Sequence, residues 1–346
     1  MASPHRVCSF GRGVEDTGAR KPRLVGGGAD ERSEPRTYFI GSFSVDHANP
    51  WHSADIHHTC NACGRCCDSG PSLSLRELLT HEHTLIGCLA VRKVPRLNLG
   101  DPVTEHHRAT LEDAQEAKRL AQELFFQPQP GASYDIELAL HAFSYASLSA
   151  CPALSPDHAC SLHGPDKPLS CQCVPFDPAL PDTLQRWVLA QRGQEAQAWG
   201  AECISIHPPS APEPVVSRLR VLHPHSHTLA AWRQQRSADR SLWGDAVFAE
   251  LNAALAATQF VAVPTRGFLL LSPVGVLAHW ARRDADAERR VQRFLKAQSA
   301  LMEKTLEAAL KRKDRADRAD TQLLRTLLAK NNQLGAQLEV SLTRYP

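Results

Sequence analysis

The stretch CNACGRCC, residues 60–67, holds four of the eleven cysteines of this 346-residue chain. Cys60 and Cys63 are separated by two residues, the spacing with which a tight turn presents two thiolates to one metal ion at about 2.3 Å. Gly64 follows them and provides the permissive backbone that such a turn requires. This half of the stretch is therefore interpreted as a metal-binding turn.

Cys66 and Cys67 extend the pattern to C-x2-C-x2-C-C. The repeated two-residue interval also begins the cysteine run of bacterial ferredoxins. Side chains of neighbouring residues leave an extended backbone in opposite directions. We therefore expect Cys66 and Cys67 to face two metals, or one of them to bind while the other supports the ligands.

A second cysteine-rich stretch, CPALSPDHACSLHGPDKPLSCQC, occupies residues 151–173. Its prolines restrict the backbone and reduce the entropy lost when a loop closes around a metal. Together the stretches hold enough ligands for two four-coordinate zinc sites, two cubane clusters, or one metal site with a separate redox-active group. The candidate metal ligands are Cys60, Cys63, Cys66, Cys67, Cys151, Cys160, Cys171 and Cys173.

Three histidines lie beside or within these stretches. His57 and His58 precede the first, and His163 belongs to the second. Each is an alternative to a thiolate as a metal ligand. A further histidine-rich tract, HPHSH at residues 223–227, is interpreted as an exposed loop without a metal because of its neighbours LRVL and TLAAW.

The composition excludes several classes of protein. Lys plus Arg number 39 and Asp plus Glu 37, so nucleic acid is not an expected partner. Because no apolar run is long enough for a secretory signal or a membrane span, we expect a cytoplasmic protein with no membrane partner. A reducing compartment favours metal binding or catalysis over disulfides. The isolated Cys8, Cys88 and Cys203 are interpreted as small buried hydrophobic residues.

The predicted fold class is α+β, mainly helical, with a small irregular cysteine-rich metal-bound core and a helical C-terminal region. Residues 1–36 mix Gly, Arg, Asp and Pro without periodicity and are expected to form a disordered leader. Residues 37–205 are assigned to the cysteine-cluster metal-binding domain. Residues 206–346 are assigned to the mainly helical C-terminal region.

Local patterns predict individual elements. Ser74 and Glu77 have the spacing of a capping box before a short helix. Residues 135–142 alternate apolar and polar side chains, which is typical of a half-buried strand. The tail is expected to pack back onto the body after a solvated helical bridge at 311–320. Further helices are predicted at 111–126, 184–203, 239–257 and from 275 onward, and a hairpin is predicted from FVAVP (260–264) and GFLLLSP (267–273).

The ordered cysteines, with their glycine and proline neighbours, resemble the CxxCxxCC cysteine-cluster family, the YkgJ-like zinc- or iron-chelating domains. The resemblance covers about residues 55–180. It implies binding of zinc, iron or a 4Fe–4S cluster and names no reaction. The pair Cys171 and Cys173 departs from the usual pattern, so either is a weaker candidate. The residues that carry the resemblance are CNACGRCC, Gly70, Pro71, Glu77, Cys151 with PAL, Cys160 with SLH, PLS with Cys171, and Val174, Pro175 and Phe176.

Three functional hypotheses follow. The first is a metal-chelating module whose C-terminal helices bind a protein partner or a second copy of the chain. The second is an enzyme, either an iron–sulfur redox protein or a relative of flagellin lysine N-methylase, which is related to the family. The third is a thiol–disulfide switch, in which Cys66 and Cys67 exchange with the second stretch. The first is preferred because it requires only what the cysteine spacing provides.

Overall fold

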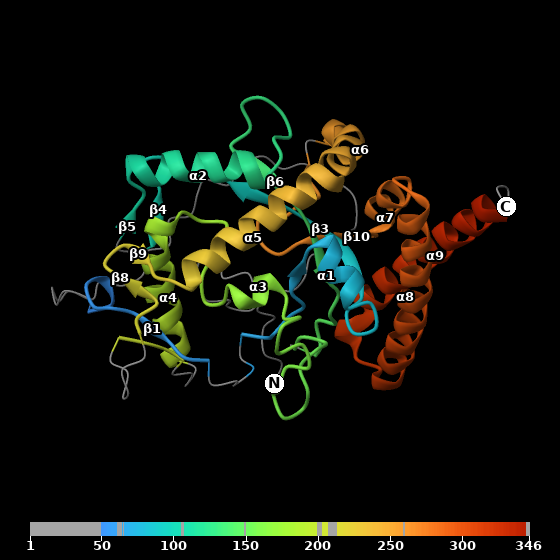
Figure 1. The fold of residues 1–346 in the computed structure, drawn as a ribbon, viewed down its shortest axis with the longest axis horizontal. Helices are drawn as coiled ribbons and strands as arrows, with labels where there is room; N and C mark the ends of the chain where they lie inside the picture. The colour runs from blue at the N-terminus through green and yellow to red at the C-terminus, as the bar shows by residue number, and fades with distance from the viewer. Residues whose placement is uncertain are drawn as a thin grey trace.

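The computed structural model describes residues 50–60, 64, 66–104, 107–148, 150–198, 203–206, 213–258 and 260–343. The expected leader, Cys8 and Cys63 lie outside these residues. The fold is α+β and mainly helical, as predicted. Figure 1 shows α4 and the short strands at one end of the molecule and the long helices α8 and α9 at the other.

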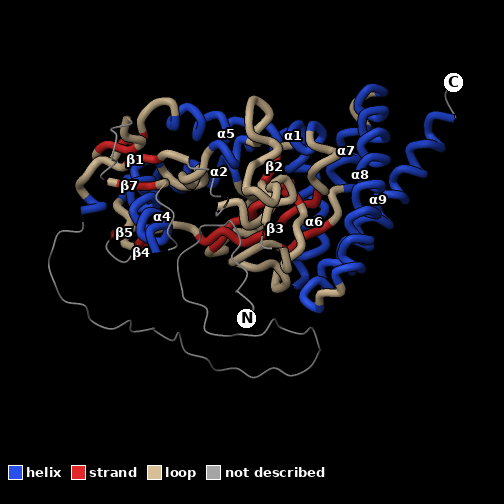
Figure 2. Tube along the Cα trace, turned by 90° about the horizontal axis from the view of Figure 1, so that it is seen from below, coloured by secondary structure: helices blue, strands red, loops and turns tan. Residues whose placement is uncertain are grey.

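The centre of the fold is a four-stranded antiparallel sheet in the order β10-β3-β6-β2. β3 (Gly87–Pro95) pairs with β6 (Tyr134–Ala142) along its whole length, from Gly87 opposite Ala142 to Pro95 opposite Tyr134. β2 (Ser72–Leu73) extends the sheet beside β6, and β10 (Leu269–Leu271) extends it beside β3. Figure 2 shows these strands between the two helical ends of the molecule.

The remaining strands form small two-stranded sheets. They are β1 (His57–His58) with β7 (Ile204–Ser205), β4 (Pro102–Thr104) with β5 (His107–Arg108), and β8 (Val216–Ser217) with β9 (Arg220–Val221).

Helices lie between the strands of the sheet in the chain as well as after them. They are α1 (Leu75–Thr80), α2 (Leu111–Leu124), α3 (Leu169–Gln172), α4 (Gln185–Ala198), α5 (His225–Asp239), the π-helical turn η3 (Arg240–Gly244), α6 (Asp245–Leu255), α7 (Val274–Ala281), α8 (Ala285–Arg312) and α9 (Arg318–Thr343). Short 3-10 turns are η1 (Pro50–His52), η2 (Asp182–Leu184), η4 (Ala256–Thr258) and η5 (Arg315–Asp317). Among the helices that the structure describes, none is long and apolar enough to cross a membrane.

The largest hydrophobic cluster joins the sheet to helices from both halves of the chain. Leu89 and Val91 of β3 and Ile136 of β6 pack in one cluster with side chains of α1, α6, α7 and α8. Two smaller clusters lie between α2, α4 and α5, and between the end of β6 and the α8–α9 pair. Apolar burial of this extent is the main stabilising contribution.

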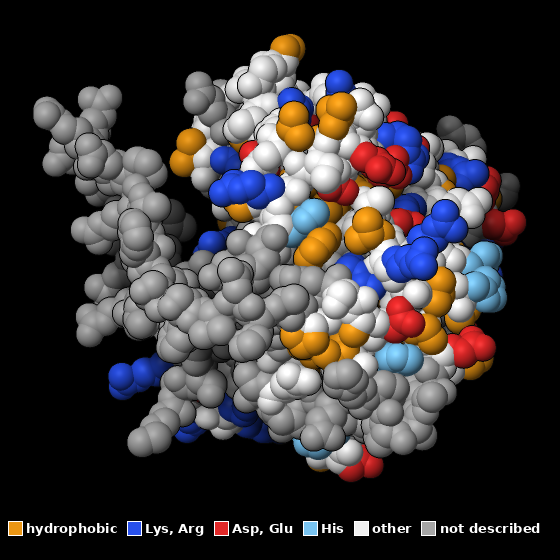
Figure 3. Space-filling view, turned by 90° about the vertical axis from the view of Figure 1, so that its left-hand side faces the viewer, with side chains coloured by type: hydrophobic (Ala, Val, Ile, Leu, Met, Phe, Trp, Pro, Cys, Tyr) orange, Lys and Arg blue, Asp and Glu red, His pale blue; other side chains and the backbone are white. Residues whose placement is uncertain are grey.

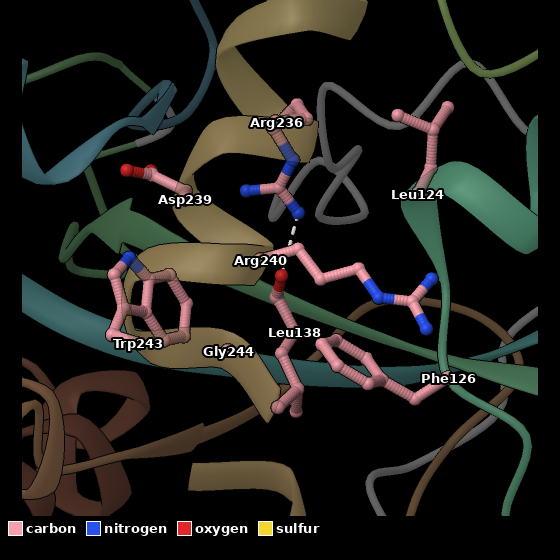
Figure 4. A pocket seen from close by; sticks show the side chains of 8 residues that line it. All are labelled: Leu124, Phe126, Leu138, Arg236, Asp239, Arg240, Trp243 and Gly244. Atoms are coloured by element: carbon pink, nitrogen blue, oxygen red, sulfur yellow. Dashed lines mark hydrogen bonds between the residues drawn. The ribbon is translucent and has the colours of Figure 1, made fainter. Parts of the chain in front are cut away.

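Arg236 of α5 fills a gap at the edge of the sheet. Along the edge of β6, β2 pairs with residues 140 and 141, and Phe126 forms a bridge with Ile136. On this edge, none of the described strands pairs with Leu138, which lies between these two contacts. Arg236 donates from Nη2 to that carbonyl at 2.6 Å, as Figure 4 shows. Leu138, Arg236, Asp239 and Trp243 line a cavity of about 10 Å³, enough for one water molecule.

Several predicted elements are confirmed. Ser74 and Glu77 form a capping box at the start of α1, and each accepts a hydrogen bond from the other's backbone N–H. Helices near 111–126 and 184–203 and the strand near 135–142 are present as α2, α4 and β6. The expectation that this strand is half-buried is wrong, because the polar face of β6 is buried too: Glu137 pairs with Arg92, and Asp135 pairs with Arg96. Cys88 is fully buried, and α9 packs back onto α8.

The predicted hairpin at 260–273 is wrong. The first segment is not a strand, and β10 pairs with β3 instead. The physical reason is that β3 offers a free edge of a long strand, while Phe260 and Val263 are buried in the main hydrophobic cluster. The HPHSH tract is not a loop throughout, since α5 begins at His225.

The expected continuous helix from residue 275 is interrupted twice. Asp284 caps the N-terminus of α8 by accepting from the backbone N–H of Ala287 at 2.8 Å. At the other end Lys313 adopts a left-handed conformation with φ of 54°, and Asp317 is buried beside Arg312 at 2.7 Å. The segment 311–320 is therefore not a continuous helical bridge: α8 ends at Arg312, residues 313–317 form a turn, and α9 begins at Arg318.

The buried carboxyl group of Asp239 makes the free energy of unfolding depend on pH. It is 6% exposed and accepts from the backbone N–H of Leu75. Burial, with the nearby Glu77 charge, raises its pKa from 3.8 to about 6, although Arg236 and the Leu75 N–H lower it. The folded protein therefore holds the Asp239 proton more tightly than the unfolded chain does. The stability that this proton provides is fully present below the pKa of the unfolded chain, 3.8, and is lost as the pH rises through about 6.

We expect Asp239→Asn, which remains neutral and can still accept from Leu75, to match the wild type at a pH below the unfolded pKa. Above the folded pKa it should be more stable by about 3 kcal/mol. Urea unfolding across this pH range measures the difference, with exposed Asp286→Asn as the control. A difference that does not vary with pH would contradict the assignment.

Candidate metal centre

Pairing of β2 with β6 brings the two cysteine stretches together. Cys66 and Cys67 lie shortly before β2, and β6 leads into the loop that contains Cys151. The backbone N–H of Ala142 donates to the carbonyl of Pro71 at 2.9 Å. A Cβ on Gly70 would lie 2.2 Å from the Ala142 carbonyl oxygen, so this close approach requires glycine.

Direct contacts then join the two stretches. The backbone N–H of Cys151 donates to the carbonyl of Cys67 at 2.7 Å. The turn before it is closed by the N–H of Cys67 donating to Gly64 at 2.9 Å. Gly64 has φ of 70°, and a Cβ there would lie 3.0 Å from Nδ1 of His158. The first turn thus packs against the second loop with glycine at the contact.

The second loop folds back on itself and returns to the first. Leu154 and Cys160 form an antiparallel bridge, and the N–H of Ser161 donates to Ala153 at 2.9 Å. Cys171 follows on α3, where its N–H donates to the carbonyl of Pro168 at 2.9 Å. Cys151 and Cys171 lie near enough to Cys67 to affect its charge, and Cys160 lies near Cys151 and Cys171.

Cys66 and Cys67 share a hydrogen bond between their side chains. The bond lowers the pKa of Cys66 to about 7, because the Cys67 thiol stabilises the Cys66 thiolate. The same bond, burial and the neighbouring Cys66, Cys151 and Cys171 raise the pKa of Cys67. Ionisation of Cys66 is therefore favoured, and ionisation of Cys67 beside it is opposed.

Burial also raises the pKa of Cys151 and raises that of Cys171 to about 12. Cys160 adds to the rise at both positions, while the Lys167 ammonium lowers the pKa of Cys171 and of Cys66. Charges on neighbouring thiols thus raise the pKa of Cys67, Cys151 and Cys171. Several thiolates together require a positive charge among them, which a bound metal ion provides.

The other candidate ligands are placed differently. Cys60 is exposed, and Cys63 lies outside the described residues. Cys173 is 1% exposed in a hydrophobic cluster, and its Sγ donates to the carbonyl of Thr228 at 3.8 Å. The two thiols of the 171–173 pair therefore differ in their contacts: Cys171 lies near Cys67 and Cys151, and Cys173 contacts α5, although the charge of Cys171 still acts on it.

The histidines near the cysteine stretches differ in their exposure. His163 is exposed on the second loop. His58 is half-buried, and burial together with His225 and Lys167 lowers its pKa to about 4. His225 lies with its ring 5.3 Å from that of Phe176. Local spacing alone could not find the neighbours His225 and Lys167, since each is distant in sequence from His58.

Glu77 anchors α3 from outside the thiol group. Its Oε1 accepts from the backbone N–H of Leu169 at 2.7 Å, and its Oε2 accepts from Ser74 N–H at 2.8 Å. Pro168 offers no side-chain cap for α3, so Glu77 supplies it from α1. Ser170 Oγ adds a bond to the Ser72 carbonyl at 2.6 Å. These contacts determine where Cys171 lies.

Among the described residues, no three His, Cys, Asp or Glu side chains are arranged closely enough to be assigned as metal ligands. No protein-family model, curated protein or solved structure matches the chain. The contacts described above define the candidate centre: a group of neighbouring thiols and the elements that position them.

Removal of the Glu77 carboxylate should loosen α3. We expect Glu77→Ala to lower the free energy of unfolding by about 2 kcal/mol, because two partly buried backbone N–H groups lose a charged acceptor. Glu77→Gln keeps one acceptor oxygen and should lose less. Exposed Glu112→Ala is the control for urea unfolding.

A second measurement separates positioning from general stability. Thiol labelling of Cys171 should become faster in Glu77→Ala, while buried Cys88 stays protected. Equal acceleration at both cysteines would mean that the substitution destabilises the whole fold and does not act on α3.

Proposed function

We propose that this protein chelates a thiophilic metal ion, zinc or iron, through thiolates of its two cysteine stretches. The observation that carries the proposal is the contact between stretches far apart in the sequence, made by the Cys151 N–H and the Cys67 carbonyl at 2.7 Å. The thiols proposed to bind are Cys66, Cys67, Cys151, Cys160 and Cys171, with Cys60 and Cys63 added from the preceding turn.

The donor chemistry supports this proposal. Thiolates are soft ligands that select zinc, copper(I) and iron–sulfur clusters over magnesium or calcium. Because burial holds Cys151 and Cys171 protonated in the absence of a cation, metal binding would release protons, and affinity should rise with pH. Glu77 holds α3 in place for Cys171, and Gly64 and Gly70 allow the backbones to approach.

Metal analysis decides which ion binds. Protein purified without oxygen would be measured by visible absorption and elemental analysis. A brown solution with iron and acid-labile sulfide supports a cluster such as 4Fe–4S, and a colourless solution with zinc supports a chelating module. Protein free of both metals that does not take up either would contradict the proposal.

Cysteine substitutions test the ligand assignment. Cys171→Ser should weaken zinc or iron binding by at least about tenfold, because it removes a proposed ligand. Cys173→Ser should change it little, since that thiol faces α5. Cys88→Ser is a matched control, because its Sγ donates to the His141 carbonyl at 3.1 Å and a hydroxyl can keep that bond. Equal metal retention in the Cys171 and Cys88 variants would refute the assignment.

A thiol–disulfide switch is the second candidate, and the hydrogen bond between Cys66 and Cys67 favours it. A thiolate with a pKa of about 7 at Cys66 is a competent nucleophile towards a disulfide such as oxidised glutathione. The switch predicts rapid labelling of Cys66 with or without a chelator. Chelation predicts that labelling is slow until the chelator removes the metal.

The enzymatic alternatives, an iron–sulfur redox protein or a methylase-type enzyme, share the same metal measurement. Iron with sulfide would direct the work to redox assays. Zinc would direct it to the partners of the C-terminal helices.

A further inference from the structure

A groove of about 460 Å³ lies at the corner between α7 and α8, away from the cysteine stretches. Its wall combines one aromatic side chain with several arginines and two aspartates. The lining residues are Trp280, Arg283, Asp284, Asp286, Ala287, Arg289, Arg290 and Arg293. The groove shares no residue with the proposed metal centre.

The acidic groups of the groove are already engaged. Asp284 caps α8 by accepting from Ala287, and Asp286 pairs with Arg289. Arg290 turns towards α1, where it pairs with Glu82 at 2.5 Å and donates to the Leu79 carbonyl at 2.6 Å. These pairs account for two of the four arginines.

Arg283 and Arg293 remain without such a partner. Both are exposed, and within the part of the chain that the structure describes neither side chain makes a hydrogen bond or ion pair. Trp280 is half-buried beside them and packs on the main hydrophobic cluster with its inner side. The groove thus presents the guanidinium groups of Arg283 and Arg293, which have no partner among the described residues, together with the half-buried ring of Trp280.

Other parts of the surface differ from this groove. Figure 3 shows the end of the molecule that carries α4 and the short strands, where basic, acidic and hydrophobic side chains are interspersed. Along residues 282–296, by contrast, the chain has six basic residues, Arg282, Arg283, Arg289, Arg290, Arg293 and Lys296, and three acidic ones, Asp284, Asp286 and Glu288. Positive charge is concentrated here in a chain of formal net charge +2.

The geometry points to this groove as a docking site for an acidic peptide segment of a protein partner. Guanidinium groups bind carboxylates with paired hydrogen bonds. Trp and Arg are also the side chains that most often dominate binding at protein interfaces. An apolar side chain of the peptide packs on Trp280, and carboxylates on either side pair with Arg283 and Arg293.

A peptide fits this groove better than a nucleic acid. Asp284 and Asp286 lie in its wall and would repel a continuous phosphate backbone, which carries a charge at every nucleotide. A peptide can place carboxylates only where the arginines are.

The test uses a fluorescein-labelled synthetic peptide in which glutamates flank a central leucine, measured by fluorescence anisotropy at low salt with the full chain. Arg283→Glu combined with Arg293→Glu should weaken binding by about tenfold or more. The control, Arg325→Glu with Lys330→Glu on the exposed face of α9, makes the same change in net charge and should alter binding less than about twofold.

A charge-reversed peptide completes the test. The groove double variant should gain binding to a peptide with lysines in place of the glutamates, and the α9 double variant should not. Equal loss in both variants, no binding by the wild type, or tighter groove-dependent binding of duplex DNA or phosphatidylserine vesicles would overturn the proposal.

Discussion

The antiparallel pairing of β3 with β6 is the constraint on which the rest of the structure depends. It pairs nine residues in each strand, from Gly87 and Ala142 at one end to Pro95 and Tyr134 at the other. β2 joins the same end of β6, so the chain that enters β2 and the chain that leaves β6 must run side by side. Both cysteine stretches lie on those two segments. Their proximity is thus a consequence of sheet register, and the small size of Gly70 allows it.

α1 connects this sheet to both sides of the molecule. Its N-terminal turn is held by Ser74 and Glu77, and Glu77 continues to the N-terminus of α3. Asp239 of α5 accepts from the first N–H of the same helix at 3.1 Å. A change in the position of α3 therefore reaches α1 and α5 through hydrogen bonds. Metal binding at Cys171 would be coupled in this way to the stability of the helical part of the fold.

Sequence patterns predicted the elements in which apolar and polar residues are regularly spaced and missed those without such spacing. The alternation in β6 was sufficient to predict a strand, and the capping box was sufficient to predict α1. β3 shows no alternation because Gly87 to Val91 are all buried, as in a central strand covered on both sides. The break at Lys313 escaped prediction because the buried Asp317 that follows it bonds not only with the nearby Arg312 but also with the distant Ser147, which no local pattern shows.

The sequence by itself determined the mainly helical α+β class, the candidate thiols and the glycines beside them, because spacing and residue type carry that information locally. Only the tertiary structure decided which thiols become neighbours. It gave Cys171 and Cys173 different contacts, although one residue lies between them, and brought Cys67 next to Cys151, which is far from it in the sequence. It also paired Arg289 and Arg290 with carboxylates, while Arg283 and Arg293 have no such partner among the residues that the structure describes. The physical reason is that contacts between distant residues depend on strand register and helix packing, which no short pattern specifies.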